Sequence, residues 1–482
     1  MESSQRVAPN AVMVPSMGQG HINGAMLLSR SLAALGFHVS FIYFSSYYAK
    51  LRDMNRLPVP DPDNMTIDGC GSICVHVLED AFGPGDLDKH FFVTPTMKES
   101  LFGFIHGEQQ PAVTRPTCVV SDSFAPWTLE VAQRAGIPRV EFWTSNAMAY
   151  LSVTNLIHLY SEGVFPEKGS PTKWRSESPL MLDHIRGLPP FSSEVLPIEL
   201  RFADASDPFV KFFNEVELCS KHSERLLINS VTDLEPSAFE ALDVQGVKAY
   251  GIGPLPNPVK KPARRNAECI SWLDSQADDS VLYVAFGSFA VLSAEETQEL
   301  AMGLEGSGGP FLWVIREDTH NQQELPRILP EGFLDRTKDR GLIVTWAPQV
   351  EVLAHRAVGG FLSHCGWNST LESLGAGVPL LCCPRLAEQR MNCEYICEKW
   401  GAGVEMMRTD TGGLERGYVE AGIKALLHGE EARTARKNAE RIMELTRRSH
   451  QEGGQSLANL RRFYDDMRVL CANSAAQSLR AT

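Results

Sequence analysis

Residues 346–389 read WAPQVEVLAHRAVGGFLSHCGWNSTLESLGAGVPLLCCPRLAEQ, and this stretch decides the fold class. Short apolar runs alternate here with segments of helical spacing, and Gly or Pro residues separate them. Together with the residues just before it, the stretch predicts strands at 341–346, 360–363 and 378–383 and helices at 348–355 and 368–374. Strands that alternate with helices are typical of a parallel sheet covered by helices on both faces.

The same alternation extends through the rest of the chain. The second half predicts strands at 281–286 and 311–315 around a helix at 295–304, and the first half predicts strands at 11–15, 37–44, 117–120 and 140–143 with helices at 22–35 and 126–135. Between the halves, 253–262 carries four prolines and two lysines, which is typical of a linker. Two α/β halves joined in this way predict a cleft, where ligands bind beyond the carboxyl ends of the strands.

Composition and charge narrow the classes of partner. The chain has 482 residues, and 45 Lys and Arg against 59 Asp and Glu give a net charge of −14. Nucleic acids and anionic membrane surfaces recruit basic patches, so neither is an expected partner. No run approaches the roughly 18 apolar residues of a membrane-spanning helix. The first ten residues are polar and the eleven cysteines are an odd number, so we expect no secretory signal, reduced thiols and a cytoplasmic location.

Several catalytic motifs are absent from the sequence. It contains no GxxxxGK[ST], HExxH or GxSxG, so it lacks the signatures of P-loop nucleotidases, zincins and standard α/β-hydrolases. Cys393 and Cys397 are four residues apart and lack His partners, which does not predict zinc. Gly18-Gln19-Gly20 leaves a nicotinamide-dependent enzyme as an alternative, although the acidic residue expected about 20 positions later is missing.

Residues 363–369 (SHCGWNS) join a predicted strand to the start of a predicted helix. Backbone N–H groups and the helix dipole at such a start favour a phosphate group. The side chains of His364, Asn368 and Ser369 add hydrogen-bond donors at the same place. The spacing of Ser369 and Glu372 also fits a capping box, an alternative that needs no ligand.

His21 and Asp122 each follow a predicted strand, although they are far apart in the sequence. Because the ends of parallel strands share one edge of a sheet, the two side chains can meet. A His with an ordinary pKa of about 6.5 suits a general base, and an Asp beside it would fix its tautomer. The alternatives are structural, with His21 as a turn or capping residue and Asp122 as a helix N-cap.

The quoted stretch closely resembles the 44-residue signature box of plant family 1 UDP-sugar-dependent glycosyltransferases, whose WAPQ, HCGWNS, Glu and Asp-Gln-like landmarks stand in register. The resemblance extends through GQGHIN, SDSFAPW, NSVTDLEP, SWLD and VLYVAFGS over nearly the whole chain. It implies the α/β GT-B fold, in which two Rossmann-like domains face each other across a cleft. The acceptor-binding domain would span 1–252 and the UDP-sugar-binding domain 268–455, with a linker at 253–267 and a tail at 456–482 that returns to the first domain.

The resemblance also implies which residues hold the nucleotide. Trp346 would stack on uracil beside Ala347 and Gln349, unless its indole is simply a core side chain. Glu372 would accept hydrogen bonds from the ribose hydroxyls. The diphosphate would be held by Ser288, His364, Asn368 and Ser369.

At the sugar end, the family's pattern implies contacts from Thr144, Trp367, Glu388 and Gln389. Trp367 would pack against the sugar ring, and the last two would take its hydroxyl groups. Gln at the position of Gln389 accompanies glucose donors in the family, so UDP-glucose is the expected donor. Many members have Asp in place of Glu388 and an aromatic residue in place of Leu386, which leaves the acceptor side open.

The resemblance therefore predicts an inverting glucosyltransferase with His21 as general base, assisted by Asp122. Its acceptor would be a hydroxyl of a small lipophilic phenolic, flavonoid or terpenoid. Apolar candidates for the acceptor pocket, which fit core packing equally well, are Phe91, Phe92, Phe124, Met148 and 188–190. Another UDP-sugar donor, a nucleotide-sugar epimerase and a non-catalytic nucleotide-sugar-binding protein are the alternatives.

We expect no metal cofactor and a monomer whose partners are small molecules. A metal-dependent transferase would hold its cation with an Asp-x-Asp triplet beside the diphosphate. The triplets Asp61-Pro62-Asp63 and Asp86-Leu87-Asp88 lie outside the box, in turn-like segments of the N-terminal half. The box carries two Arg and three Glu, so neutral donors and a helix start would have to hold the anionic donor.

Overall fold

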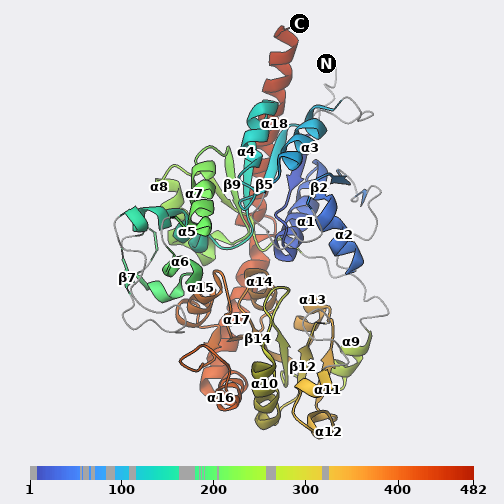
Figure 1. The fold of residues 1–482 in the computed structure, drawn as a ribbon, viewed down its shortest axis with the longest axis vertical. Coiled ribbons are helices and arrows are strands. Elements are labelled where there is room, and N and C mark those ends of the chain that lie inside the picture. The colour runs from blue at the N-terminus through green and yellow to red at the C-terminus, as the bar shows by residue number, and fades with distance from the viewer. Residues whose placement is uncertain are drawn as a thin grey trace.

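The computed structural model describes residues 8–54, 57, 65–66, 71–82, 93–107, 116–161, 180–183, 185, 187–188, 190–203, 206–256, 267–316 and 325–481. Within these ranges the chain forms two α/β units, each built on its own sheet, which lie one above the other in Figure 1. The α/β class and the two Rossmann-like units predicted from the sequence are confirmed. The Asp-x-Asp triplets, Phe91, Phe92, Pro189 and linker residues 257–266 lie outside the described residues.

The N-terminal sheet has eight strands in the order β10-β9-β6-β5-β1-β2-β4-β3. The strands are β1 Asn10–Val14, β2 His38–Phe44, β3 Met65–Thr66, β4 Ser72–Leu78, β5 Cys118–Asp122, β6 Arg139–Trp143, β9 Arg225–Ile228 and β10 Ala249–Gly251. β3 pairs antiparallel with β4, and the other described pairs of this sheet are parallel. All residues of β1, β5 and β6 are buried, as expected for strands covered by helices on both faces.

The helices of this unit are α1 Gln19–Ala34, α2 Ser45–Asp53, α3 Pro95–His106, α4 Thr128–Ala135, α5 Ala147–Ser161, α6 Ile198–Arg201, α7 Pro208–Ser220 and α8 Pro236–Val244. Two single turns of 3₁₀ helix, at Ser193–Val195 and Thr232–Leu234, and a small hairpin of β7 Met181–Leu182 with β8 Phe191–Ser192 complete it. α1 follows β1 and α5 follows β6, so both helices begin at the carboxyl edge of the sheet.

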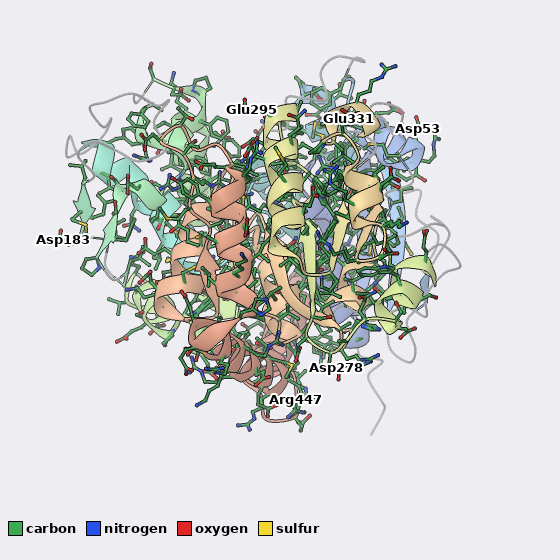
Figure 2. The ribbon with its side chains drawn as sticks, turned by 90° about the horizontal axis from the view of Figure 1, so that it is seen from below. Asp53, Asp183, Asp278, Glu295, Glu331 and Arg447 are labelled. Carbon is green, nitrogen blue, oxygen red and sulfur yellow. The ribbon has the colours of Figure 1, made fainter. Side chains whose placement is uncertain are left out.

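The C-terminal sheet has six parallel strands in the order β13-β12-β11-β14-β15-β16. They are β11 Val281–Ala285, β12 Phe311–Val314, β13 Gly341–Val344, β14 Val358–Ser363, β15 Leu380–Cys382 and β16 Gly403–Glu405. The helices are α9 Ala267–Asp274, α10 Ala294–Ser307, α11 Leu325–Ile328, α12 Phe333–Thr337, α13 Gln349–Leu353, α14 Trp367–Gly375, α15 Gln389–Glu394, α16 Arg416–Leu427 and α17 Gly429–Ser449, with a π-helical turn at Tyr395–Lys399. Exposed charged side chains such as Glu295, Glu331, Asp278 and Arg447 project at the rim of this unit (Figure 2).

Several strands are shorter than the sequence predicted, among them the strand expected at 378–383, which spans Leu380–Cys382. The strand expected at 341–346 ends at Val344, which pairs with Val314, the last residue of β12. Because β12 offers no further partner, the chain leaves the sheet, and Trp346 lies in the connection to α13. This shift places its side chain at the carboxyl edge rather than in the sheet.

The last helix, α18 Gln455–Ala481, crosses from the C-terminal unit to the N-terminal sheet (Figure 1). Ser456 Oγ donates to the Gly253 carbonyl at 2.6 Å, and Phe463 is fully buried in the N-terminal core. Farther along, Asp466 accepts from Arg225 at 3.0 Å and from the Tyr250 hydroxyl at 2.9 Å. The helix therefore ties the two units together. No helix in the described ranges is long and apolar enough to cross a membrane.

Candidate active site

The carboxyl edges of the two sheets contact each other at the starts of their helices. Asn368, in the first turn of α14, donates from Nδ2 to the carbonyl of Gly20 in the first turn of α1 at 3.0 Å. Ser145, just after β6, donates to Glu388 Oε1 at 3.2 Å. Residues predicted from opposite halves of the sequence therefore lie in one region. Ser288, in the turn after β11, is partly exposed on the same edge.

His21 and Asp122 form a hydrogen bond, as their positions after two strands predicted. His21 Nδ1 lies 2.7 Å from Asp122 Oδ2, and Thr144 Oγ1 lies 3.4 Å from the same nitrogen. The other carboxylate oxygen of Asp122 accepts from the Phe124 backbone N–H at 2.8 Å. Two partners thus fix the carboxylate, which is 2% exposed, whereas the His21 side chain is 27% exposed.

The helix-capping alternatives for this pair are wrong. His21 lies inside the first turn of α1, whose N-cap residue is Gly18 and has no side-chain cap. α4 begins at Thr128 with Trp127 as its N-cap, so Asp122 does not cap it. Asp122 instead stabilises the turn at Phe124 with one oxygen and orients His21 with the other.

The electrostatic environment favours the charged form of His21. Burial lowers its pKa, but the charge and hydrogen bond of Asp122, with a further contribution from Glu388, outweigh this effect and raise the pKa above 6.5. Because Nδ1 faces the carboxylate, the neutral imidazole carries its proton there. Nε2 is then the nitrogen that can accept a proton. Phe124 packs against the imidazole with ring centroids 5.0 Å apart.

The turn before α14 places a helix start against the N-terminal unit. Gly366 is the N-cap residue and makes no side-chain cap, so Ser369 lies within the first turn and the capping-box interpretation is wrong. The first backbone N–H groups of a helix have no partner inside it, which suits an anionic oxygen. Cys365, immediately before, has a φ of +64°, a strained value for a residue other than glycine.

His364 lies beneath this turn as a neutral imidazole. A Cβ on Gly287 or on Gly366 would approach its Nε2 to 2.5 and 2.4 Å, so both glycines make room for the ring. Burial, together with the positive charge of Arg316, lowers the pKa of His364 to about 4. No described residue forms a hydrogen bond with its Nδ1. His364 can therefore offer an N–H group, but no positive charge, near neutral pH.

Four residues of the predicted uridine end lie near one another. Gln349 Nε2 donates to Ser369 Oγ at 3.0 Å and to Glu372 Oε2 at 2.8 Å. Trp346 is 58% exposed, so the interpretation as a core side chain is wrong, and Ala347 beside it is buried. An exposed indole next to a carboxylate and a hydroxyl can stack on a flat base while the polar groups bind a sugar.

The expected packing of the Trp367 indole against the sugar ring needs correction. The side chain is 4% exposed, and its Nε1 donates to the carbonyl of Asn229 in the N-terminal unit at 2.7 Å. The ring also packs against Trp400. Since the indole is committed to the domain interface, the backbone N–H at the start of α14 is the group that Trp367 can offer a ligand.

Glu388 and Gln389 lie at the start of α15. Gln389 Oε1 accepts from the backbone N–H groups of Arg385 and Leu386 at 2.9 and 3.0 Å. These two bonds hold the loop before the helix and turn the amide nitrogen of Gln389 away from that loop. The residue before Glu388, Ala387, has a φ of +53°, so the loop is strained at the sugar end of the site.

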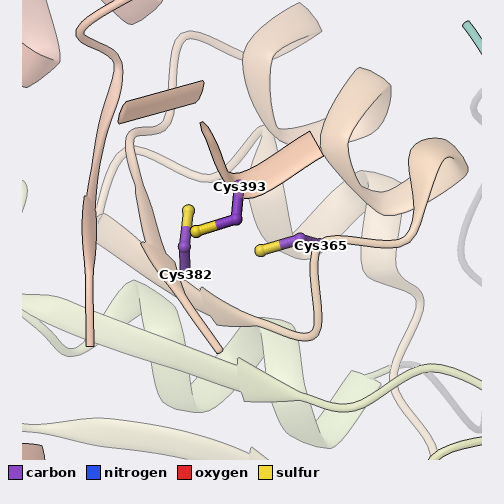
Figure 3. Close-up of side chains that lie close together, drawn as sticks. All are labelled: Cys365, Cys382 and Cys393. Carbon is purple, nitrogen blue, oxygen red and sulfur yellow. The ribbon is translucent and has the colours of Figure 1, made fainter. Parts of the chain in front are cut away.

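Sequence spacing missed a cluster of three thiols under the turn. The Sγ atoms of Cys365, Cys382 and Cys393 all lie within 4.8 Å of one another (Figure 3). Cys365 donates to the Ser363 carbonyl, and burial raises the pKa of the Cys365 and Cys382 thiols. These two thiols are therefore protonated near neutral pH, whereas hydrogen bonds with Cys365, Cys382 and Cys397 lower the pKa of Cys393. The sequence likewise gave no signal for Asn146 and Asn392, whose buried side chains bridge the two units.

Known proteins resemble this chain in sequence and in fold. Residues 218–452 match the family model described as UDP-glucoronosyl and UDP-glucosyl transferase. UDP-glycosyltransferase 85A1 of Arabidopsis thaliana is 33% identical over 461 residues, which cover 89% of this chain and 90% of the relative. 7-deoxyloganetin glucosyltransferase of Gardenia jasminoides is 33% identical over 475 residues, or 94% and 96% of the two chains. The solved structure of Phytolacca americana UGT2 complexed with UDP-2fluoro-glucose and pterostilbene has a TM-score of 0.77 and 28% identity, covering 97% of this chain and 100% of that one.

The ionisation of His21 can be measured by NMR titration of its imidazole. We expect a midpoint above 6.5 in the unmodified protein, because Asp122 favours the protonated ring. In Asp122→Asn the charge is lost and the shape is retained, so the midpoint should fall. His364 should stay neutral throughout the neutral range and serves as the internal control. An equal midpoint in the two proteins would show that Asp122 does not control the ionisation of His21.

Proposed function

The chain belongs to the plant family 1 UDP-glycosyltransferases and has their GT-B fold, and from this premise we propose that it transfers glucose from UDP-glucose to a hydroxyl of a small lipophilic acceptor, with inversion. The observation that carries the proposal is the hydrogen bond between His21 and Asp122, on an edge that touches the start of α14. A base and an anion-binding helix start lie on opposite sides of one reaction site.

Each chemical step has a residue to perform it. His21 Nε2 takes the proton of the acceptor hydroxyl, and Asp122 stabilises the imidazolium that forms. The activated oxygen attacks the anomeric carbon from the face opposite the UDP group, so a new C–O bond forms as the bond to the diphosphate breaks. The negative charge that develops on UDP is met by the N–H groups at the start of α14 and by neutral side-chain donors.

The proposed donor roles follow the order of residues along the cleft. Trp346, with Ala347 and Gln349 beside it, binds the base, and Glu372 binds the ribose. The diphosphate contacts Ser288, His364, Asn368 and Ser369, and the sugar contacts Thr144, Glu388 and Gln389. Glucose is proposed from Gln389 and from the glucosyltransferase activity in the name of the Gardenia jasminoides relative.

The acceptor side is apolar next to the base. Phe124 contacts the His21 ring and also meets Trp143, Phe212 and Phe213 edge-on. An aromatic wall beside a proton acceptor suits a lipophilic alcohol or phenol. Met148, at 2% exposure, is a core side chain rather than part of such a wall. The names 7-deoxyloganetin and pterostilbene among the similar proteins support terpenoid and phenolic acceptors for this chain.

A matrix of UDP-sugars against phenolic, flavonoid and terpenoid alcohols tests the proposal, with UDP release and product mass as readouts. We expect transfer from UDP-glucose to exceed transfer from UDP-galactose, and we expect full activity with excess chelator, because neutral donors hold the diphosphate. Samples without acceptor detect an epimerase. No transfer from UDP-glucose to any acceptor, or activity lost to chelator and restored by a divalent cation, would contradict the corresponding part of the proposal.

Replacing His21 by Ala should lower kcat by about 10²–10⁴-fold, the usual contribution of a positioned base. The affinity for UDP should change little, because the donor residues lie mainly on the other unit; isothermal titration calorimetry measures it. His38→Ala is the matched control, since that imidazole bonds Ser72 at the opposite edge of the sheet and should leave transfer unchanged. Full turnover by His21→Ala would exclude His21 as the base.

A further inference from the structure

Three consecutive residues of the N-terminal unit, 144–146, reach three different parts of the site. The contacts are Thr144 Oγ1 to His21 Nδ1 at 3.4 Å, Ser145 Oγ to Glu388 Oε1 at 3.2 Å and Asn146 Nδ2 to Asn392 Oδ1 at 2.5 Å. This segment leads from β6 into α5 and is anchored at the carbonyl of Asn146 by the Trp143 indole N–H. The base, the sugar end and α15 are therefore aligned by one short piece of backbone.

The third contact continues to the turn that precedes α14. Asn392 Nδ2 donates to the carbonyl of Cys365 at 2.9 Å. Asn146 and Asn392 are 2% and 0% exposed, so water does not compete for these bonds. A chain of amide hydrogen bonds thus runs from the N-terminal unit to the residue just before the proposed diphosphate site.

Backbone groups at both ends of this chain of hydrogen bonds fix the orientation of the two side-chain amides. Asn146 Oδ1 accepts from the Ala149 N–H at 2.7 Å, as the cap of α5, so its amide nitrogen must face Asn392. Asn392 must donate to the Cys365 carbonyl, so its oxygen is left to accept from Asn146. Each amide therefore has one orientation that satisfies all its partners.

The chain of amide hydrogen bonds ends at a residue with a strained backbone. Cys365 has a φ of +64° and precedes the N-cap Gly366, so the direction of the following N–H groups depends on its conformation (Figure 3). Such a conformation persists when surrounding bonds hold it in place. The bond from Asn392 holds the Cys365 carbonyl, and Asn146 holds Asn392.

We propose that Asn146 and Asn392 are positioning residues: Asn392 keeps the turn at Cys365 in the shape that binds the diphosphate, and Asn146 sets this turn in register with His21 across the domain interface. The proposal rests on the proposed function, since it assigns the diphosphate to this turn. Neither residue touches the reacting atoms. They act through the backbone of 365–369 and through the relative position of the two units.

Two substitutions remove the two hydrogen bonds one at a time. As a carboxylate, the side chain of Asn392→Asp still accepts from Asn146 but cannot donate to the Cys365 carbonyl, so the turn loses its support. Asn146→Ser still caps α5 but does not reach Asn392, so only the bond between the units is lost. If Asn392→Asp does not fold, the smaller and neutral Asn392→Ser replaces it.

Matched controls come from two asparagines outside the site. Asn438→Asp removes a bond of the same kind, from an amide to the Gly401 carbonyl in the C-terminal unit. Asn155→Ser makes the same change as Asn146→Ser farther along α5, where the amide bonds the Leu151 carbonyl. Both controls should keep the UDP affinity and the kcat/KM of the unmodified protein.

The two variants should fail in different ways. For Asn392→Asp we expect UDP affinity to fall about tenfold, the usual effect of one unsupported buried polar group. For Asn146→Ser we expect kcat/KM to fall about tenfold while UDP affinity stays within about twofold, because the turn is intact but out of register. Unchanged affinity in Asn392→Asp, or unchanged kcat/KM in Asn146→Ser, would overturn the proposal.

Hydrogen exchange of the free protein tests the turn without any ligand. Peptides covering 363–369 should exchange faster in Asn392→Asp than in Asn438→Asp, and equal rates would overturn the role of Asn392. If the unmodified protein bound no UDP, the proposed function would fail, yet this exchange measurement would still decide whether Asn392 holds the turn. The failures of the two proposals are therefore distinguishable.

Discussion

The site depends on one constraint: the carboxyl edges of two separate parallel sheets must face each other at contact distance. The bond from Asn368 to the Gly20 carbonyl expresses it most directly, because it joins the first turns of α14 and α1. α1 carries His21, and α14 is the helix whose start suits a diphosphate. With the two helix starts in contact, an acceptor next to the proposed base would lie beside the proposed donor. α18, which returns to the N-terminal sheet, helps to hold the units in place.

The local environment of each site residue, rather than the net charge of the molecule, determines its protonation. The chain has a net charge of −14, yet its proposed ligand is an anion. His364 contributes a neutral ring, because burial and Arg316 lower its pKa to about 4. The pKa of His21 is shifted in the opposite direction, because Asp122 raises it. Two histidines on facing edges thus have opposite pKa shifts, which suits one to donate a hydrogen bond to a phosphate and the other to exchange a proton.

The alternation of strands and helices and the contact between His21 and Asp122 could be predicted from the sequence, because strand ends are marked by local patterns and parallel strands share an edge. Features that depend on side-chain direction could not. The spacing of Ser369 and Glu372 fitted a capping box until the helix start was located at Trp367. The indole of that residue turns into the domain interface instead of the cleft. The bond between Asn146 and Asn392 joins residues 246 positions apart, a distance over which no periodic pattern extends.

The anomeric configuration of the product tests the central claim most directly. If His21 is the base and the start of α14 binds the leaving group, as proposed, the acceptor oxygen attacks the anomeric carbon from the side opposite to UDP. The account predicts that the α-linked glucose of UDP-glucose appears only as a β-glucoside, identified by the large coupling of its anomeric proton in the NMR spectrum. A product with α-linked glucose would contradict the account.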